Sequence, residues 1–217
     1  LPYALTDENI DALDALSQPY RFGSSLWAPG PAVFGNPRVY KQRYGDYEVG
    51  KRETRYLGSW RMQNDPEAVK DLFKRAFELG WDKIDTSENY SLENNRDNPQ
   101  VQPIISEAAE EYARDRDGFD IHDVVTKIDP PDGGTDRVYD LDAIEDQVKQ
   151  IYEYWDKPYI DHIAILLHWP VGNHVDAYHK LREVIANNLP QNVKTIRTGV
   201  SNYGPNRLKA LMDSENR

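Results

Sequence analysis

The sequence predicts an α/β fold in which parallel strands alternate with helices. From residue 56 onward, short apolar segments alternate with amphipathic segments, and this strand–helix pair occurs five times. Elements of these lengths form right-handed parallel crossovers, and near-continuous apolar strands indicate a sheet covered on both faces. The pattern alone fits a doubly wound sheet or a barrel. No Gly-x-Gly-x-x-Gly segment follows any strand, which argues against a dinucleotide-binding doubly wound sheet.

We expect two parts in the chain, an N-terminal extension over residues 1–55 and an α/β part over residues 56–217. Thr6 is a candidate helix cap, and the apolar residues after it predict a surface helix that ends before Pro19. Glycine, proline and aromatic residues then dominate, and a hairpin with its turn near Gly45 is expected among them. We assign no chemistry to this extension.

The α/β part is expected to begin with a strand at residues 56–60. Asp65 and Pro66 then open a helix, because aspartate caps unpaired backbone N–H groups and proline is favoured at the first helical position. Gly80 ends this helix, whose apolar residues recur on one face, and the second strand follows at residues 81–86.

The remaining elements follow the same logic. A capping side chain, a proline or both open each helix, and a run of aliphatic or β-branched residues forms each strand. The helices are expected to begin at Asn98–Pro99, Asp140, Asn173 and Pro205, and the strands to span 123–128, 160–167 and 196–200.

Composition limits the classes of function. The chain of 217 residues has a net charge of -11, which argues against nucleic acid as a partner. No apolar run approaches the roughly 20 residues that span a bilayer, so no membrane partner is expected. Cysteine is absent, which excludes disulfides, thiol nucleophiles and cysteine-ligated zinc. That absence also fits a reducing compartment, and we predict a cytoplasmic location.

Four polar residues lie at or just beyond strand ends: Asp85, Tyr90, Lys127 and His168. In a parallel α/β fold these ends gather on one face, which is the usual place for a site. A free tyrosine, with a pKa of about 10, donates a proton poorly at neutral pH. A nearby lysine would favour the phenolate, a carboxylate would hold that lysine, and a histidine would orient a substrate carbonyl. The set therefore suits proton delivery to a carbonyl during hydride transfer from a nicotinamide.

Each of these residues, taken singly, also fits a structural role. Asp85 could cap a turn, Tyr90 and Lys127 could be solvent-exposed groups, and His168 could belong to the core. The combination favours a site, because all four lie at the same end of successive strands.

The other histidines give no sign of a metal site. His122, His162, His174 and His179 fall in no metal-ligand spacing. His174 and His179 are five positions apart, which misses the i, i+4 pairing of ligands on one helix face. We therefore predict no metal.

Five segments resemble aldo-keto reductases in their order and register. Gly80 to Tyr90 resembles the family signature in which an aspartate and a tyrosine are five residues apart. The others resemble the family's first barrel strand, lysine strand, histidine strand and nicotinamide-holding strand, and they span 57–60, 124–127, 166–170 and 199–203.

The resemblance implies an (α/β)8 TIM barrel, a nicotinamide cofactor bound without a Rossmann fold, and reduction of aldehydes or ketones to alcohols. It also implies that the four polar residues above are catalytic, with Tyr90 as the proton donor, and it favours NADPH over NADH. The cofactor-binding residues would be Ser59, Trp60, Asp85, Ser201 and Asn202, and the substrate pocket would contain Trp60, Tyr90, His168 and Trp169.

The chain departs from the family in length. A barrel of this type usually takes about 250 residues, whereas the residues after Tyr56 supply five strand–helix units. We therefore expect an incomplete barrel, either a fragment or a natural truncation. Unclosed strands leave apolar edges that pair with other chains. A homo-oligomer or a completing polypeptide is thus an expected partner, beside a small carbonyl substrate.

Three alternatives stay open from the sequence. The chain could be a non-catalytic regulatory or binding subunit of the same fold, which the length and the aromatic N-terminal extension favour. It could be a fragment that is inactive until another chain completes it. It could also be a flavin- or phosphate-binding barrel in which the motifs are coincidental.

Overall fold

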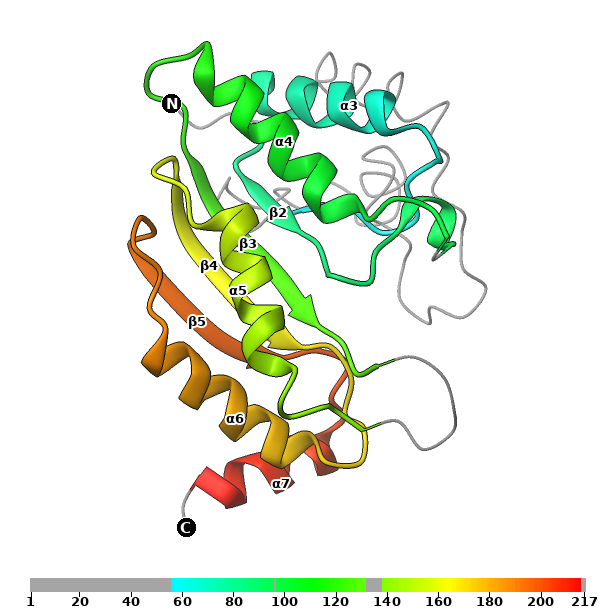
Figure 1. Cartoon of the computed structure of the whole chain (residues 1–217), viewed down its shortest axis with the longest axis vertical. Coiled ribbons are helices and arrows are strands. Elements are labelled where there is room, and N and C mark those ends of the chain that lie inside the picture. Colours follow the sequence, from blue (N-terminus) through cyan, green and yellow to red (C-terminus); the bar gives the residue numbers. More distant parts are fainter. Residues whose placement is uncertain (1–55, 96, 132–137, 216–217) are drawn as a thin grey trace, which may run out of the picture. The chain divides into compact units, whose positions relative to one another are not determined.

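The computed structural model describes residues 56–95, 97–131 and 138–215 (Figure 1). The helix and hairpin expected within residues 1–55 lie outside these ranges. The chain forms two compact units: Tyr90–Gly118 group with the residues up to Asp85, and Thr86–Asn89 group with Phe119–Arg217. The division between residues 55 and 56 stays a prediction.

The first unit contains strands β1 (Leu57–Gly58) and β2 (Lys83–Asp85), which pair in parallel with Leu57 opposite Ile84. Helix α3 (Pro66–Glu78) connects them. The predicted cap is confirmed, because the Asp65 side chain accepts a hydrogen bond of 3.1 Å from the backbone N–H of Ala68. Gly80 follows the helix with φ of +80°, a backbone conformation that favours glycine.

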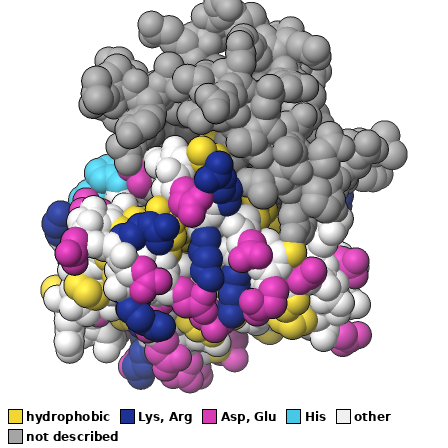
Figure 2. Space-filling view, turned by 90° about the horizontal axis from the view of Figure 1, so that it is seen from above, with side chains coloured by type: hydrophobic (Ala, Val, Ile, Leu, Met, Phe, Trp, Pro, Cys, Tyr) yellow, Lys and Arg dark blue, Asp and Glu magenta, His cyan; other side chains and the backbone are white. Residues whose placement is uncertain are grey.

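Helix α4 (Val101–Arg114) lies beside α3. Their shared core is aromatic: the Phe77 ring lies 6.2 Å from Phe73 and 5.6 Å from Tyr112, centroid to centroid. Lys70 and Lys74 on α3 form ion pairs with Glu107 and Glu111 on α4. On the face seen in Figure 2, cationic and anionic side chains are likewise interleaved.

Helix α4 begins later than predicted. The Nδ2 group of Asn98 donates to the carbonyl of Leu92 over 3.0 Å, so this side chain closes a turn and does not cap the helix. The turn includes a short 3-10 helix, η3 (Leu92–Asn94). Gln100 then bridges to Ser91 in antiparallel fashion, and the helix can begin only at Val101.

The second unit contains three parallel strands in the order β3 (Ile121–Ile128), β4 (Ile160–Leu167) and β5 (Thr195–Val200). Helices α5 (Ile144–Trp155) and α6 (His174–Asn187) pack against each other and against the strands (Figure 1). Helix α7 (Pro205–Glu215) follows β5 and contacts α6. The fold class predicted from the sequence is therefore confirmed, with five parallel strands alternating with helices.

An ion pair crosses the sheet of the second unit. Asp123 on β3 is paired with His162 in the ladder, and Arg197 on β5 is paired with Ala164. The guanidinium Nη2 of Arg197 lies 2.5 and 2.6 Å from the two carboxylate oxygens of Asp123, which is buried. The pair thus joins β3 to β5 across β4.

Helix α5 also begins later than predicted. The Asp140 carboxylate accepts from the N–H groups of Asp142 and Ala143 over 3.1 and 3.4 Å, so it caps a turn that precedes the helix. The first helical residue is Ile144. Among the described residues, no helix is both long enough and apolar enough to cross a bilayer.

Candidate functional site

Lys127 and His168 lie at the carboxyl ends of neighbouring strands in the second unit. Lys127 is the penultimate residue of β3, and His168 directly follows β4. The backbone N–H of His168 donates to the carbonyl of Ile128 over 3.0 Å, which extends the ladder by one residue. Both side chains are buried, with 5% and 7% of their residues' surfaces exposed. Buried polar groups at this end of a parallel sheet are typical of a site.

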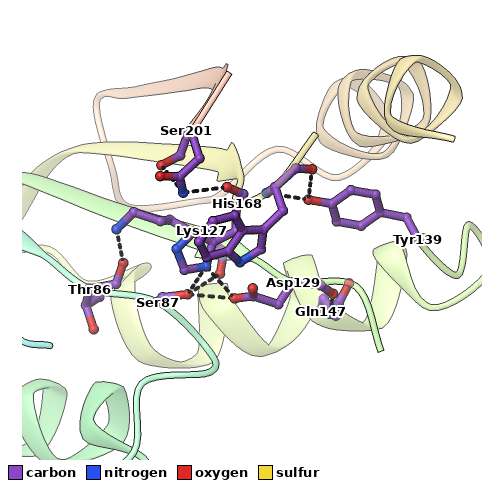
Figure 3. A network of polar contacts seen from close by, with 10 residues as sticks. Thr86, Ser87, Lys127, Asp129, Tyr139, Gln147, His168 and Ser201 are labelled. Carbon is purple, nitrogen blue, oxygen red and sulfur yellow. Dashed lines mark hydrogen bonds and ion pairs between the residues drawn. The ribbon is translucent and has the colours of Figure 1, made fainter. Parts of the chain in front are cut away.

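His168 belongs to a buried polar network with Asp129 and Ser87 (Figure 3). Its Nδ1 lies 2.8 Å from Oδ2 of Asp129, and the hydroxyl of Ser87 donates to the same oxygen over 2.8 Å. A carboxylate can only accept, so this contact favours the hydrogen on Nδ1. That leaves Nε2 as the ring nitrogen that can face a substrate.

Lys127 is held by the segment that follows β2. Its Nζ donates to the carbonyl of Thr86 over 2.8 Å. The same segment is bound to β3 by its backbone, because Thr86 donates to the carbonyl of Val125 and Glu88 donates to that of Lys127, over 2.8 and 3.2 Å. The ammonium group therefore has a fixed position beside residues 86–88.

Asp85 and Tyr90 belong to the first unit. The carbonyl of Asp85 accepts from both the N–H and the hydroxyl of Ser59, over 3.0 and 3.1 Å. The carbonyl of Tyr90 accepts from the N–H of Val101, at the start of α4. Both side chains are half-buried. That the Asp85 carboxylate and the Tyr90 phenol meet Lys127 and His168 stays a prediction.

Glu88 is a buried carboxyl beside this network. Burial, and after it the negative charge of Asp129, raise its pKa to about 8. Its Oε1 has no hydrogen-bond partner in the described part of the chain. Near neutral pH the side chain is therefore mostly protonated, since the charged form would be poorly solvated.

Ser201 and Asn202 follow β5 directly. The Ser201 N–H donates to the carbonyl of Leu167 over 2.8 Å, which places the pair beside the end of β4. Asn202 has φ of +61°, and its Nδ2 donates to the carbonyl of His168 over 2.9 Å and to the hydroxyl oxygen of Ser201 over 3.3 Å. Among the described residues, none binds the side-chain oxygen of Asn202 or accepts from the Ser201 hydroxyl, so both groups can bind a ligand. One acceptor beside one donor fits the NH2 and C=O groups of a carboxamide.

The two tryptophans predicted to line the site both expose apolar surface. Trp169 is 40% exposed, and its ring stacks on His168 with centroids 4.9 Å apart. Trp60 is 43% exposed, and the guanidinium of Arg61 lies 4.2 Å from the centroid of its ring. Trp169 thus offers a flat surface directly beside the imidazole.

Tyr139 and Asn173 fix the backbone of Trp169. The buried hydroxyl of Tyr139 donates to the carbonyl of Trp169 and accepts from its N–H, each over 3.0 Å. The Asn173 amide binds the N–H and the carbonyl of Tyr139 over 2.7 and 2.8 Å. Helix α6 begins directly after Asn173, as predicted, and the Asn173 side chain binds Tyr139 and does not cap the helix.

Sequence reasoning missed five polar residues of this region. Ser87, Glu88 and Asp129 stand within two positions of Asp85, Tyr90 or Lys127, and this proximity was the signal that could have found them. Tyr139 and Asn173 carry no comparable signal, because only the folded chain brings them to Trp169.

Comparison with known proteins gave one family model and several solved structures. The model described as the aldo/keto reductase family matches residues 54–216. One structure, described as a candidate 2,5-diketo-D-gluconic acid reductase B, is 21% identical with a TM-score of 0.47, and the match covers 71% of this chain and 46% of that one. Another, an aldo-keto reductase from Bacillus halodurans in its holo form, is 17% identical with a TM-score of 0.49, covering 72% and 48%. The chain spans about half the length of these structures. A search of curated proteins gave no significant match.

Proposed function

The chain belongs to the aldo/keto reductase family, and we propose that it contributes the carbonyl-reducing site of an NADPH-dependent oxidoreductase. The observation that carries the proposal is the buried group of Lys127, Asp129 and His168 at the carboxyl ends of β3 and β4. Burying charged groups costs free energy unless they are paired. In a sheet with only a structural role, burying these three ionisable side chains together would bring no gain in stability.

The proposed roles follow from the chemistry of each group. Tyr90 donates the proton to the carbonyl oxygen, and Lys127 supplies the positive charge that favours the phenolate left behind. Asp85 holds the lysine. His168 would orient the substrate carbonyl through Nε2, which donates a hydrogen bond when the ring carries a second proton, and the Asp129 carboxylate beside Nδ1 would balance that charge. Together they would fix the carbonyl and deliver its proton.

The residues after β5 suit the cofactor. The nicotinamide supplies the hydride when bound. Ser201 and Asn202 would hold its carboxamide, since they offer one donor and one acceptor side by side. Ser59, Trp60 and Asp85 are proposed as further cofactor-binding residues. NADPH, rather than NADH, stays a prediction from the family resemblance.

The substrate class is a small aldehyde or ketone. Trp60 and Trp169 present aromatic surface, and the stacked ring of Trp169 lies beside the imidazole that would bind the carbonyl oxygen. Apolar walls around few polar groups are typical of small-molecule sites. A cytoplasmic location stays a prediction.

Three variants test the proposal. Tyr90→Phe removes the proposed proton donor, and Lys127→Met removes the proposed charge. Tyr154→Phe is the matched control, because Tyr154 is an α5 tyrosine whose hydroxyl accepts from Gln150 in an exposed contact on that helix. The rate of NADPH oxidation with a panel of aldehydes and ketones is measured beside NADPH binding by tryptophan quenching.

We expect Tyr90→Phe and Lys127→Met to lower kcat by about 10²-fold or more while NADPH binding is retained. Tyr154→Phe should match the wild type. Full turnover by Tyr90→Phe would refute the assignment. NADPH binding without turnover in the wild type would favour a binding subunit instead.

A further inference from the structure

A second cluster of ligand-type side chains lies at the opposite end of the same two strands. His122 is the second residue of β3, and Asp161 and His162 are the second and third residues of β4. One nitrogen or oxygen from each of the three lies within 4.8 Å of the others. The candidate catalytic residues stand at the carboxyl ends of these strands, whereas this cluster stands at the amino ends.

Strand register brings the three residues together. Ile121 pairs with Ile160 and Asp123 pairs with His162, which sets His122 beside Asp161 in the parallel ladder. The Nδ1 atom of His122 lies 3.5 Å from Oδ2 of Asp161. The rings of His122 and His162 meet edge to face with centroids 4.9 Å apart. Because His122 is far from Asp161 and His162 in the sequence, no motif of closely spaced metal ligands revealed the cluster.

We propose that His122, Asp161 and His162 form a site for a divalent transition-metal ion of the zinc type. Two imidazole nitrogens with one carboxylate oxygen suit Zn²⁺, Ni²⁺ and Cu²⁺, whereas Mg²⁺ and Ca²⁺ require mostly oxygen ligands. Three protein ligands would leave at least one coordination position for water.

The required adjustment is small. Zinc–nitrogen and zinc–oxygen bonds of about 2.0 to 2.2 Å place tetrahedral ligand atoms roughly 3.4 Å apart. The three side chains must therefore move closer by about an ångström. His122 is 48% exposed and the other two are half-buried, so rotation of side chains achieves this without repacking the core.

Lys194 orients the carboxylate. Its Nζ lies 2.6 Å from Oδ1 of Asp161, and its backbone N–H donates to the Asp161 carbonyl over 2.9 Å. The lysine thus binds Oδ1 of Asp161, and Oδ2 faces His122. A metal ligand held in this way by a neighbouring group is a common arrangement. The Lys194 side chain is 70% exposed, so it can swing away from an incoming cation.

A bound ion would join β3 to β4 at the end remote from the proposed reaction. We expect it to stabilise the second unit by binding the folded chain and not the unfolded one. We expect no effect on turnover, since the ligands belong to the amino ends of the strands.

Isothermal titration of the untagged, EDTA-treated chain with ZnCl2 and NiCl2 tests the site. The chain contains five histidines, so background binding is low. We expect one ion per chain. His122→Ala and His162→Ala should each weaken binding by at least about tenfold. His179→Ala is the matched control, because His179 is also a surface histidine but its Nε2 contacts Ser214 on α7.

A second measurement does not depend on whether the variants fold. Electron paramagnetic resonance of the wild-type chain with one equivalent of Cu²⁺ should show hyperfine coupling to two imidazole nitrogens. Zinc should also raise the melting temperature of the wild type and not that of His162→Ala. No stoichiometric binding, or binding that His122→Ala and His162→Ala leave unchanged, would overturn the proposal.

Discussion

The Asp129 carboxylate lies 2.8 Å from Nδ1 of His168, and both side chains are buried. Ser87 donates to the same carboxylate oxygen. Two contacts therefore orient the imidazole. Asp129 binds its Nδ1, and its ring stacks on Trp169. A histidine held in this way has few orientations left for Nε2, so the position of any carbonyl bound there would be well defined.

Asp129→Asn should show whether Asp129 affects the His168 ring without affecting NADPH binding. The amide keeps the shape of the carboxyl group but cannot balance a protonated ring, so we expect kcat to fall by about 10- to 100-fold. NADPH binding should be unchanged. Ser87→Ala removes one hydrogen bond to the Asp129 carboxylate, worth about 1.5 to 3 kcal/mol, but it leaves the negative charge in place and should lower kcat less. Steady-state kinetics and the ¹⁵N shifts of the His168 ring give the readouts, and an unchanged kcat in Asp129→Asn would contradict this role.

Glu88 should make stability depend on pH. Burial raises its pKa to about 8 in the folded chain, against an ordinary value of 4.5 for glutamate. The folded state thus holds a proton that the unfolded state releases between these pH values. The contribution of Glu88 to the free energy of unfolding is fully present below about pH 4.5. It is lost as the pH rises to about 8, by at most about 1.4 kcal/mol per pH unit.

Glu88→Gln mimics the protonated form and should remove this dependence. Urea unfolding at pH 5, 7 and 9 should show similar stabilities for wild type and Glu88→Gln at pH 5. At pH 9 the variant should be more stable by more than about 1 kcal/mol. Glu110→Gln is the control, because Glu110 is an exposed carboxylate on α4. A constant difference between wild type and Glu88→Gln across this range would show that Glu88 is ionised in the fold.

Tyr139→Phe should loosen Trp169. Burial raises the pKa of Tyr139 far above its ordinary value, so its hydroxyl stays protonated and keeps donating to the carbonyl of Trp169. Its loss would leave two backbone groups of Trp169 without a partner from Tyr139, at a cost of about 1 to 3 kcal/mol. Thermal unfolding gives the stability. Tryptophan fluorescence anisotropy reports the added mobility, and stability equal to that of the wild type would argue against the clamp.

Asn202 can be tested with a matched pair of substitutions. Its φ of +61° is tolerated by asparagine and glycine but costs about 1 kcal/mol for alanine. Asn202→Gly should therefore be more stable than Asn202→Ala, although both lose the hydrogen bond to the His168 carbonyl. Both should weaken NADPH binding equally. Chemical denaturation and fluorescence titration measure the two effects, and equal stability of the pair would indicate that the backbone relaxes.

The strands and the first helix were predictable because their signals are local. The apolar run at residues 160–167 became β4 with the expected bounds. Asp65 and Pro66 opened α3 as expected, since capping depends on neighbours along the chain. Asn98 was misleading as a helix start for the opposite reason. Its amide binds the carbonyl of Leu92, and such a contact depends on how the chain folds back.

Part of the candidate site was predictable for the same reason. Lys127 and His168 stand at strand ends, which hydrophobic runs reveal. The contact of Asp129 with His168 was not predictable, because the two residues belong to different strand ends and meet only in the sheet. The cluster of His122 with Asp161 and His162 was likewise not predictable, since the register of β3 against β4 sets His122 beside Asp161.

The ion pair between Asp123 and Arg197 has a consequence for how the sheet assembles. If β5 slipped by one residue against β4, Arg197 would point to the opposite face. The Asp123 carboxylate would then be buried without its cation, at a cost of about 3 to 5 kcal/mol. A slipped pairing of β5 is therefore penalised relative to the native one, and the contact between Asp123 and Arg197 favours the native alignment of β5.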